Sequence, residues 1–176
     1  DIARALYDDR TLVRMLGMRR TMFVVPTAFA PVVQHSSADA VAARLRRTYV
    51  EAIASGSSIA DPDSWLAEVE ESVVRHLRER GEATGVQLSK AEPRLRTKIS
   101  YAKGKAYGGE ITLTSRILNL LSVEGRIVRG RPGGAWNGSQ YAWSAIEQWF
   151  PEGLPRLAAA EARVELVGAW LAAFGP

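Results

Sequence analysis

The sequence predicts a mainly α-helical chain with small β-hairpins, an α+β fold built around a winged helix-turn-helix. Between Trp65 and Trp143, a long helical pattern, a short one, a second long one and two β-rich runs follow each other, which is the element order of a winged helix. A second pair of β-rich runs, between Leu12 and Val25, has the character of a wing whose helices are missing. This leaves open a tandem arrangement with a partial first winged helix.

The N-terminal part is expected to contain one hairpin and three helices. The hairpin follows from two runs of β-branched and apolar residues joined by a short connection that contains Gly17. The helices follow from apolar residues three and four positions apart, and the last begins at a serine because serine side chains cap helix N-termini. In order, these elements are a helix over 2–8, strands over 11–16 and 21–25, a helix over 27–34 and a helix from Ser36 or Ser37 to about 56.

The C-terminal part is expected to contain the winged helix and one further helix. Asp63 or Ser64 is predicted to cap the first helix, and Gly81 to end it. Residues 111–124 carry leucines and isoleucines on one side and polar residues on the other, and form the predicted recognition helix. In order, these elements are a helix over 63–80, a short helix over 84–88, the helix over 111–124, strands over 126–129 and 140–143, and a helix over 158–174.

Turn-rich stretches divide the chain into three predicted parts. The Gly56-Ser57-Ser58 stretch separates residues 1–58, a hairpin and helices left from a preceding winged-helix domain, from a winged-helix DNA-binding domain over 59–155. Residues 156–176 are expected to form a helix that leads into a further, absent domain. The chain begins with Asp1, and its first residues resemble neither a signal peptide nor a translation start, so we expect a central fragment of a longer protein.

The positive charge of the chain is concentrated in the predicted winged helix. The formal net charge is +4, yet residues 94–131 contain nine Lys and Arg against Glu110 and Glu124, a local net charge of +7. A basic block in an otherwise mildly acidic chain is typical of a surface that binds a polyanion, although such runs also occur as solvated loops. Winged helices bind either DNA or protein, and the basic block favours DNA.

Polar side chains on the predicted recognition helix are candidate DNA contacts. Thr112, Ser115 and Asn119 lie three and four residues apart on one face, with Arg116 beside them. Arg pairs with guanine and Asn with adenine, whereas Ser and Thr mostly hold phosphate. A solvated charge explains Arg116 equally well, and a local cap explains Asn119.

Further candidate contacts lie outside the recognition helix. In the wing, Arg129, Arg131 and Asn137 are expected near the DNA backbone or minor groove, whereas Arg126 is expected to be structural. Trp136 at the wing tip either stacks on a base or packs back on the wing. The remaining candidates are basic residues of the stretch before the recognition helix and of the N-terminal hairpin, namely Lys98, Lys103, Lys105, Arg19 and Arg20.

Few enzymatic or metal-binding chemistries fit the residues present. The chain has no cysteine and two histidines, which excludes thiolate and histidine-rich metal centres. No Asp-His-Ser order supports a catalytic triad, and the chain contains no Walker sequence and no apolar stretch near the roughly 20 residues of a membrane span. We therefore expect no catalytic residue and no cofactor. Acidic residues of the first winged-helix helix are expected on its exposed side, paired with neighbouring arginines: Glu68, Glu70, Glu71, Arg75 and Arg78.

Two stretches carry a resemblance to a known family: residues 12–26, Leu-Val-Arg-Met-Leu-Gly-Met-Arg-Arg-Thr-Met-Phe-Val-Val-Pro, and residues 115–143, centred on Glu-Gly-Arg-Ile-Val-Arg-Gly. The first resembles the R-x-x-x-M-R-G-T-L-H-x-V hairpin, and the second resembles the second winged helix, of the AlkZ/YcaQ-like DNA glycosylases. These bacterial winged-helix proteins excise alkylated bases and unhook crosslinks. Arg20 stands where the family has Gly, and Phe23 where it often has His.

The resemblance implies the DNA-binding portion of a repair protein without its catalytic residues. In the family, a Gln-x-Gln or Gln-x-Asp pair upstream would polarise the attacking water. None of the glutamines in this chain has Gln or Asp two residues later: Gln34, Gln87, Gln140 and Gln148. The expected function is therefore to grip alkylated or crosslinked duplex DNA, mainly through its backbone, in the cytoplasm at the nucleoid.

Two alternatives remain open from the sequence. A winged-helix transcriptional regulator would bind a specific operator as a dimer, with residues 27–56 as its dimerisation surface. A protein-interaction module would have no nucleic-acid role. The expected partners are double-stranded DNA and flanking winged-helix domains of the same protein, with no membrane; a homo-oligomer is compatible with these partners.

Overall fold

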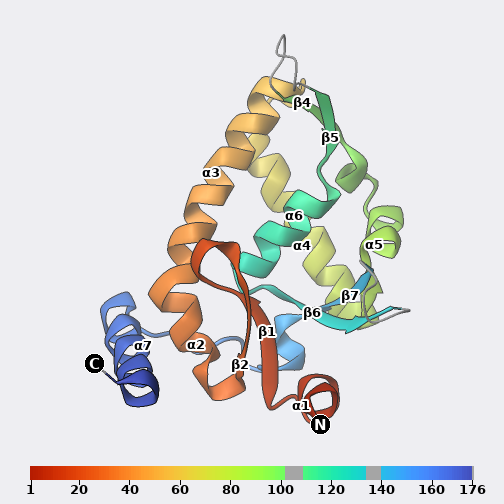
Figure 1. The fold of residues 1–176 in the computed structure, drawn as a ribbon. Helices are drawn as coiled ribbons and strands as arrows, with labels where there is room; N and C mark the ends of the chain where they lie inside the picture. Colours follow the sequence, from red (N-terminus) through yellow and green to blue (C-terminus); the bar gives the residue numbers. More distant parts are fainter. Residues whose placement is uncertain (102–108, 134–139, 176) are drawn as a thin grey trace.

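A computed structural model describes residues 1–101, 109–133 and 140–175 (Figure 1). In this part of the chain helices dominate, and the strands form small antiparallel sheets of two, three and two strands. This confirms the predicted mainly α-helical α+β class. In Figure 1 the long helix α3 (Asp39–Gly56) runs along one side, and α6 (Thr114–Val123) lies in front of α4 (Pro62–Arg80).

The N-terminal hairpin forms as predicted. After the short helix α1 (Ile2–Tyr7), β1 (Leu12–Leu16) pairs antiparallel with β2 (Met22–Pro26). The 3₁₀ turn η1 (Met18–Arg20) connects them. It places both Arg19 and Arg20 in the left-handed region of backbone conformation, with φ of 54° and 60°.

A continuous helical path follows the hairpin, where the sequence predicts a break. η2 (Thr27–Phe29) and α2 (Ala30–Val33) lead through a π-helical turn, η3 (Gln34–Ala38), straight into α3. The prediction that Ser36 or Ser37 begins a new helix is wrong. Both hydroxyls donate to the carbonyl oxygen of Val33 behind them, so neither caps a helix N-terminus.

The winged-helix elements follow in the expected order. The prediction that Asp63 or Ser64 caps the first of these helices is wrong, because α4 is capped by Asp61, two residues before Asp63, whose side chain accepts from the N–H of Ser64; the helix ends at Gly81 as predicted. β3 (Ala83–Thr84) and α5 (Gly85–Ala91) follow, and Thr84 begins α5 with a capping box. The wing consists of β6 (Ile127–Pro132) and β7 (Tyr141–Ala145), which form one sheet with β3 in the order β3-β7-β6.

A second hairpin, missed in the sequence, is inserted before the recognition helix. The 3₁₀ turn η4 (Pro93–Arg96) leads into β4 (Lys98–Tyr101), which pairs with β5 (Gly109–Thr112). The predicted helix over 111–124 is therefore wrong in its first turn, because Ile111 pairs with Ile99 across the hairpin and α6 begins only after it. Figure 1 shows this hairpin at the end of the molecule away from both termini.

One hydrophobic core joins α3 to the winged helix. Tyr49 and Ile53 of α3 are buried among side chains of α4, α5, α6 and the wing sheet. A second cluster joins the N-terminal hairpin to the wing through Val13, Met15 and Val128. The division at residue 58 stays a prediction, but residues on both sides of it share these cores.

Helix α7 (Ala159–Phe174) packs on α2 and η3 (Figure 1). It is reached from the wing through the 3₁₀ turn η5 (Ile146–Gln148). Ala162 is buried at the contact, whereas Trp170 and Phe174 are exposed. Within the described residues, none of the helices has the length and hydrophobicity that a membrane span needs.

Candidate nucleic-acid interface

The recognition helix α6 presents a short polar face. Ser115 and Asn119 lie one turn apart and line a cleft beside the wing. Thr112, predicted on the same helical face, lies in β5 instead and lines the same cleft from the strand. Arg116 stacks over the ring of Tyr49 on α3, with 5.6 Å between its guanidinium carbon and the ring centre. The face that opens to the cleft is therefore neutral.

The cleft between α6, the start of α5 and the wing has a volume of about 410 Å³. We call it the Arg129 cleft, after the charged residue in its lining. The Arg129 guanidinium lies over the rings of Tyr141 and Trp143, at 5.0 and 5.3 Å from their centres. Its Nε is buried without a hydrogen-bond acceptor in the described structure, and burial lowers the pKa of Arg129. Arg129 is thus a partly desolvated cation without an acidic partner among the described residues.

A second groove, of about 380 Å³, separates the hairpin tip from α3. Arg19 and Arg20 of the tip line it together with Arg44 and Thr48, one turn apart on α3. In the part of the chain that the structure describes, none of these three arginines forms an ion pair. We call this site the arginine groove. Arg44 and Thr48 were not predicted from the sequence, although their spacing alone places them on one face of a helix.

Much of the basic block predicted at 94–131 is already neutralised. Lys98 and Arg131, two predicted DNA contacts, form ion pairs with Glu110 at 3.3 Å and Asp8 at 2.8 Å. Arg94 and Arg126 are also paired with carboxylates. Glu110 is already counted in the local charge of +7, but the carboxylates that pair with Arg94, Arg126 and Arg131 lie outside residues 94–131. This local charge therefore overstates the positive charge that is free to bind an anion.

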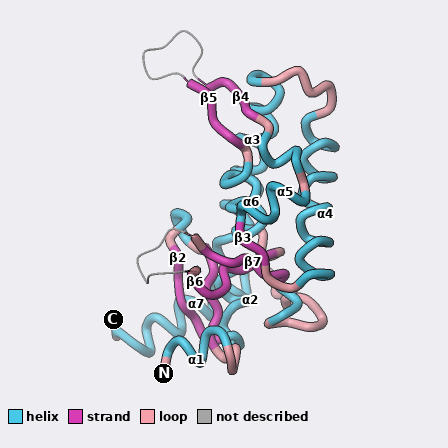
Figure 2. Tube along the Cα trace, turned by 90° about the vertical axis from the view of Figure 1, so that its right-hand side faces the viewer, coloured by secondary structure: helices cyan, strands magenta, loops and turns pink. Residues whose placement is uncertain are grey.

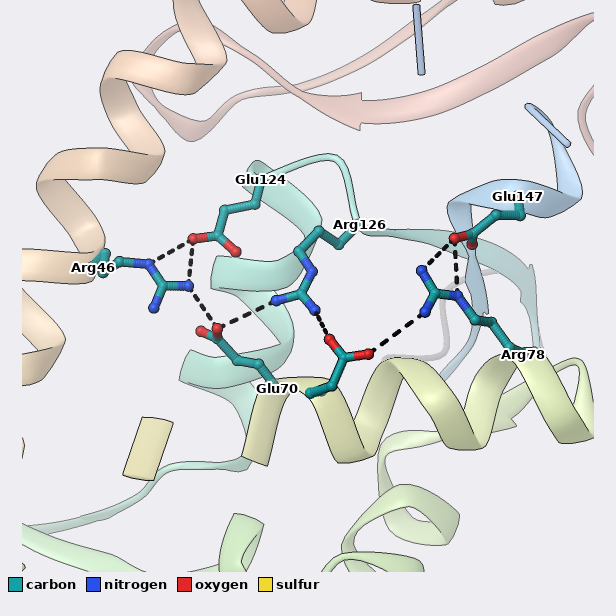
Figure 3. Close-up of polar contacts among 7 residues, drawn as sticks. Arg46, Glu70, Arg78, Glu124, Arg126 and Glu147 are labelled. Atoms are coloured by element: carbon teal, nitrogen blue, oxygen red, sulfur yellow. Dashed lines mark hydrogen bonds and ion pairs between the residues drawn. The ribbon is translucent and has the colours of Figure 1, made fainter. Parts of the chain in front are cut away.

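A chain of ion pairs behind α6 fixes the position of the recognition helix (Figure 3). Arg46 of α3 donates to Glu124 at the end of α6, at 2.7 Å, and to Glu70 of α4, at 2.6 Å. Arg126, at the start of the wing, contacts Glu70 from the other side at 3.4 Å. The chain continues through Glu71 and ends with the pair of Arg78 and Glu147, which connects α4 to η5.

Glu70 is the buried centre of this chain. Its side chain is 1% exposed, and burial raises the pKa of its carboxyl group. The prediction that it lies on the exposed side of its helix is wrong, because it stands four residues from both Leu66 and Val74 on the buried side of α4. The prediction that Arg126 is structural is confirmed by its contacts with Glu70 and Glu71.

Four predicted contacts lie outside the described residues: Lys103, Lys105, Trp136 and Asn137. Within the described ranges, no group of three or more His, Asp and Glu side chains is arranged to hold a metal ion. Gln34, the most buried of the glutamines discussed above, donates to Asp39 and to the carbonyl oxygen of Val123, and so joins the π-helical turn to the end of α6. The structure thus gives Gln34 a structural position.

Comparison with known proteins identifies the family of this chain. The family model described as DNA glycosylase AlkZ-like matches residues 1–176. The chain belongs to the AlkZ-like DNA glycosylase family. A solved structure of the Streptomyces sahachiroi DNA glycosylase AlkZ is similar, with a TM-score of 0.64 and 18% sequence identity. The match covers 99% of this chain and 43% of that chain, so this chain spans less than half the length of the solved relative. No curated protein matches the sequence.

Two departures from the AlkZ-like hairpin pattern acquire a structural meaning. Arg20 stands where the pattern has Gly, and its φ of 60° lies in the region that favours glycine. Phe23, at the position of the His, lines an apolar cavity of about 140 Å³ together with Phe29 and with Leu166 of α7. In this hairpin, therefore, an arginine, Arg20, lies in the turn, and an aromatic ring, that of Phe23, lies in the following strand β2.

Proposed function

We propose that this chain is the DNA-binding portion of a DNA-repair glycosylase and grips alkylated or crosslinked duplex DNA mainly through the sugar-phosphate backbone. Family membership supports the glycosylase class. The residues that activate water would belong to a part of the protein outside this chain, because none of its glutamines stands in the paired motif that the resemblance implies. The chain would supply affinity and orientation.

The arginine groove is the observation that carries the proposal. Arg19, Arg20 and Arg44 line one groove from two elements, and none of the described residues that line it is acidic. Like charges in proximity destabilise a fold unless an anion neutralises them. Guanidinium groups donate two parallel hydrogen bonds to a phosphate. The hydroxyl of Thr48 already donates to the carbonyl oxygen of Arg44, so the arginines are the donors that the groove offers. The groove therefore suits the backbone of a nucleic acid.

The arginine groove shares one side of the molecule with the recognition helix and the wing. In Figures 1 and 2 the N-terminal hairpin, α6 and β6 lie on the side opposite α4. We call this side the DNA face. The polar residues of α6 that line the cleft on this side are the neutral Ser115 and Asn119. Arginine is the side chain that most often recognises guanine, but Arg116 stacks on Tyr49. This composition favours phosphate contacts over base readout.

Charge reversal of the groove tests the proposal. The triple variant Arg19→Glu, Arg20→Glu, Arg44→Glu is compared with the wild-type chain by fluorescence anisotropy of a labelled duplex at several salt concentrations. If the three arginines contact three phosphates, the slope of log K against log salt falls by about 2.7, at about 0.9 for each phosphate. We expect affinity at low salt to fall by about 100-fold or more.

A matched control separates the groove from net charge. Arg75→Glu, Arg80→Glu, Lys90→Glu makes the same charge change at exposed positions of α4 and α5, none of which lines the arginine groove or the Arg129 cleft. We expect it to keep the wild-type slope. Equal losses in both triple variants would overturn the assignment of the contact to the groove.

The same assay separates the alternatives. A backbone-gripping protein binds unrelated duplexes with similar affinity, whereas a regulator prefers its operator by roughly three powers of ten or more and leaves a palindromic footprint. Absence of duplex binding by the wild-type chain at low salt would contradict the DNA function and support a protein-interaction module.

A further inference from the structure

Arg129 differs in its surroundings from two other partly buried arginines near α6, Arg46 and Arg126. Arg46 and Arg126 are held by carboxylates at 2.6 to 3.4 Å. Arg129 has aromatic rings on its guanidinium and no carboxylate within reach in the described residues. The neighbouring stretch 134–139 contains no acidic residue in the sequence either. Charged side chains that are fixed in position but have no partner of opposite charge are typical of ligand-binding sites.

The surroundings of Arg129 hold its guanidinium in a defined orientation. Arg129 stands opposite Trp143 in the β6–β7 ladder, and Tyr141 is the second ring below the guanidinium. Stacking of this kind fixes the plane of the guanidinium and leaves its N–H groups to donate sideways. None of the residues that the structure describes accepts a hydrogen bond from the buried Nε, so these residues do not use all of the donors. The orientation is thus prepared before any ligand arrives.

The lining of the Arg129 cleft selects an anion with some apolar surface. Its described residues include no acidic side chain, so the cleft does not attract a cation. Ser115 and Asn119 bring neutral hydrogen-bonding groups from α6, and Val86 and Leu118 bring apolar surface. A phosphate group fits the first set, and the carbon atoms of a sugar fit the second. The volume of about 410 Å³ exceeds that of a phosphate group alone.

We propose that the Arg129 cleft is a receptor for a single phosphate group that a nucleic-acid strand carries into it together with the adjoining sugar. This inference rests on the proposed function, and it adds a site on the wing side of α6 to the arginine groove at the hairpin tip. Phosphate contacts on both sides of the recognition helix fix the register of a duplex without reading its bases.

Three variants of Arg129 and its surroundings test the receptor in the 176-residue chain. Arg129→Gln removes one phosphate contact, so the slope of log K against log salt for duplex binding falls by about 0.9 and the affinity falls about tenfold. Arg129→Lys restores the slope but not the full affinity, because Lys keeps the charge and loses the stacked fork. Arg10→Gln is the matched control: Arg10 also stacks on a tryptophan, Trp149, but already donates to Gln148. We expect it to leave the slope unchanged.

A direct measurement on Arg129 distinguishes the sources of the phosphate. The ¹⁵N resonance of Arg129 Nε is followed on addition of inorganic phosphate, thymidine 5′-monophosphate and duplex DNA. We expect it to shift with duplex at the concentrations that saturate anisotropy, and with the two small molecules only at much higher concentrations. A shift with the small molecules alone, with an unchanged slope in Arg129→Gln, would overturn the nucleic-acid source and assign the cleft to a free nucleotide or phosphate.

The two proposals fail in different ways. If the wild-type chain binds duplex but Arg129 Nε does not respond to any of the three probes, the receptor is overturned and the arginine groove stands. If the wild-type chain does not bind duplex, the proposed function is overturned, and with it the nucleic-acid source of the phosphate.

Discussion

The guanidinium of Arg46 lies 2.6 Å from the carboxylate of Glu70, and this contact joins α3 to α4 behind the recognition helix. Glu70 is 1% exposed, and Arg46 also donates to Glu124, which follows the last turn of α6. The contact therefore sets the position of α3, which carries Arg44 and its side of the arginine groove, relative to α6. A polar contact in the interior thus sets the relative positions of α3 and α6 on the side that we propose binds DNA.

Truncation of Glu70 should destabilise the whole fold. Glu70→Ala leaves the partly buried Arg46 and Arg126 without their shared partner, and loss of one member of a buried pair costs about 3 kcal/mol of unfolding free energy. Urea denaturation measures this loss. Glu71→Ala is the matched control, because Glu71 is 58% exposed and pairs of exposed side chains contribute little. Similar losses of unfolding free energy in both variants would show that the buried contact of Glu70 stabilises the fold no more than the exposed contact of Glu71.

Acid should weaken the fold through Glu92. The N–H groups of Arg94 donate to the Glu92 carboxylate and lower its pKa from 4.5 to about 2. Because the folded value lies below the unfolded one, this stabilisation is complete above pH 4.5 and is lost as the pH falls toward 2. The carboxylate is 10% exposed, and the shift corresponds to about 3 kcal/mol. Urea unfolding of wild type and Glu92→Gln between pH 2 and 6 measures it.

Glu92→Gln should lack this component of the pH dependence. Since the variant has no carboxyl group at this position, its stability starts lower above pH 4.5 and approaches that of wild type near pH 2. A constant difference between the two proteins over this range would contradict the role of the Arg94 contact.

The sequence alone predicted those features of the fold that depend on residues close to one another in the chain. Gly81 ends α4 as predicted, and Thr84 begins α5 because it forms a capping box with Gln87. The hairpin around Gly17 also follows from short-range signals. In the candidate site, Ser115 and Asn119 share one face of a helix, as their spacing predicts.

The errors arose where distant residues decide the outcome. β4 and β5 are four residues each, and their apolar residues, such as Ile111, continue the helical pattern of α6, so that local periodicity did not separate strand from helix. The free charge of Arg131 could not be assessed either, because its partner Asp8 is 123 residues away. The burial of Glu70 could have been predicted, because Glu70 lies four residues after the apolar Leu66 on the same face of the helix. Its arginine partners could not have been predicted, because they come from other elements.

Arg20→Gly should stabilise the hairpin and weaken DNA binding. A residue with a side chain at a φ of 60° costs about 1 kcal/mol relative to glycine, which the AlkZ-like pattern has here. The variant should therefore gain about 1 kcal/mol in urea unfolding. If Arg20 contacts a phosphate, the salt slope of duplex binding should fall by about 0.9. Thr21→Gly, at a φ of −76°, is the control and should lose stability. A loss in both variants would show that Arg20 is not strained.

Neutralising Asp8 should strengthen DNA binding by releasing Arg131. Arg131 lies on the wing, stacks over Tyr7 at 4.9 Å from the ring centre and donates to Asp8 at 2.8 Å. Both charged side chains are more than half exposed, so breaking the pair costs little stability. Asp8→Asn removes the charge of the partner, so that a phosphate competes more strongly for the guanidinium, and we expect a slope of log K against log salt that is steeper by about 0.9.

Asp9→Asn separates release of Arg131 from the gain in net charge. Asp9 is the next residue and pairs with Arg4 on α1, so its replacement changes the charge of the chain by the same amount without freeing a wing arginine. Because exposed charges beyond about 10 Å are screened at 0.1 M salt, a contact made by Arg131 itself should persist at that concentration, whereas a general effect of charge fades. We therefore expect tighter binding at 0.1 M salt in Asp8→Asn and little change in Asp9→Asn. The same increase in both would place Arg131 outside the contact surface and leave the arginine groove and the Arg129 cleft as the DNA contacts of this chain.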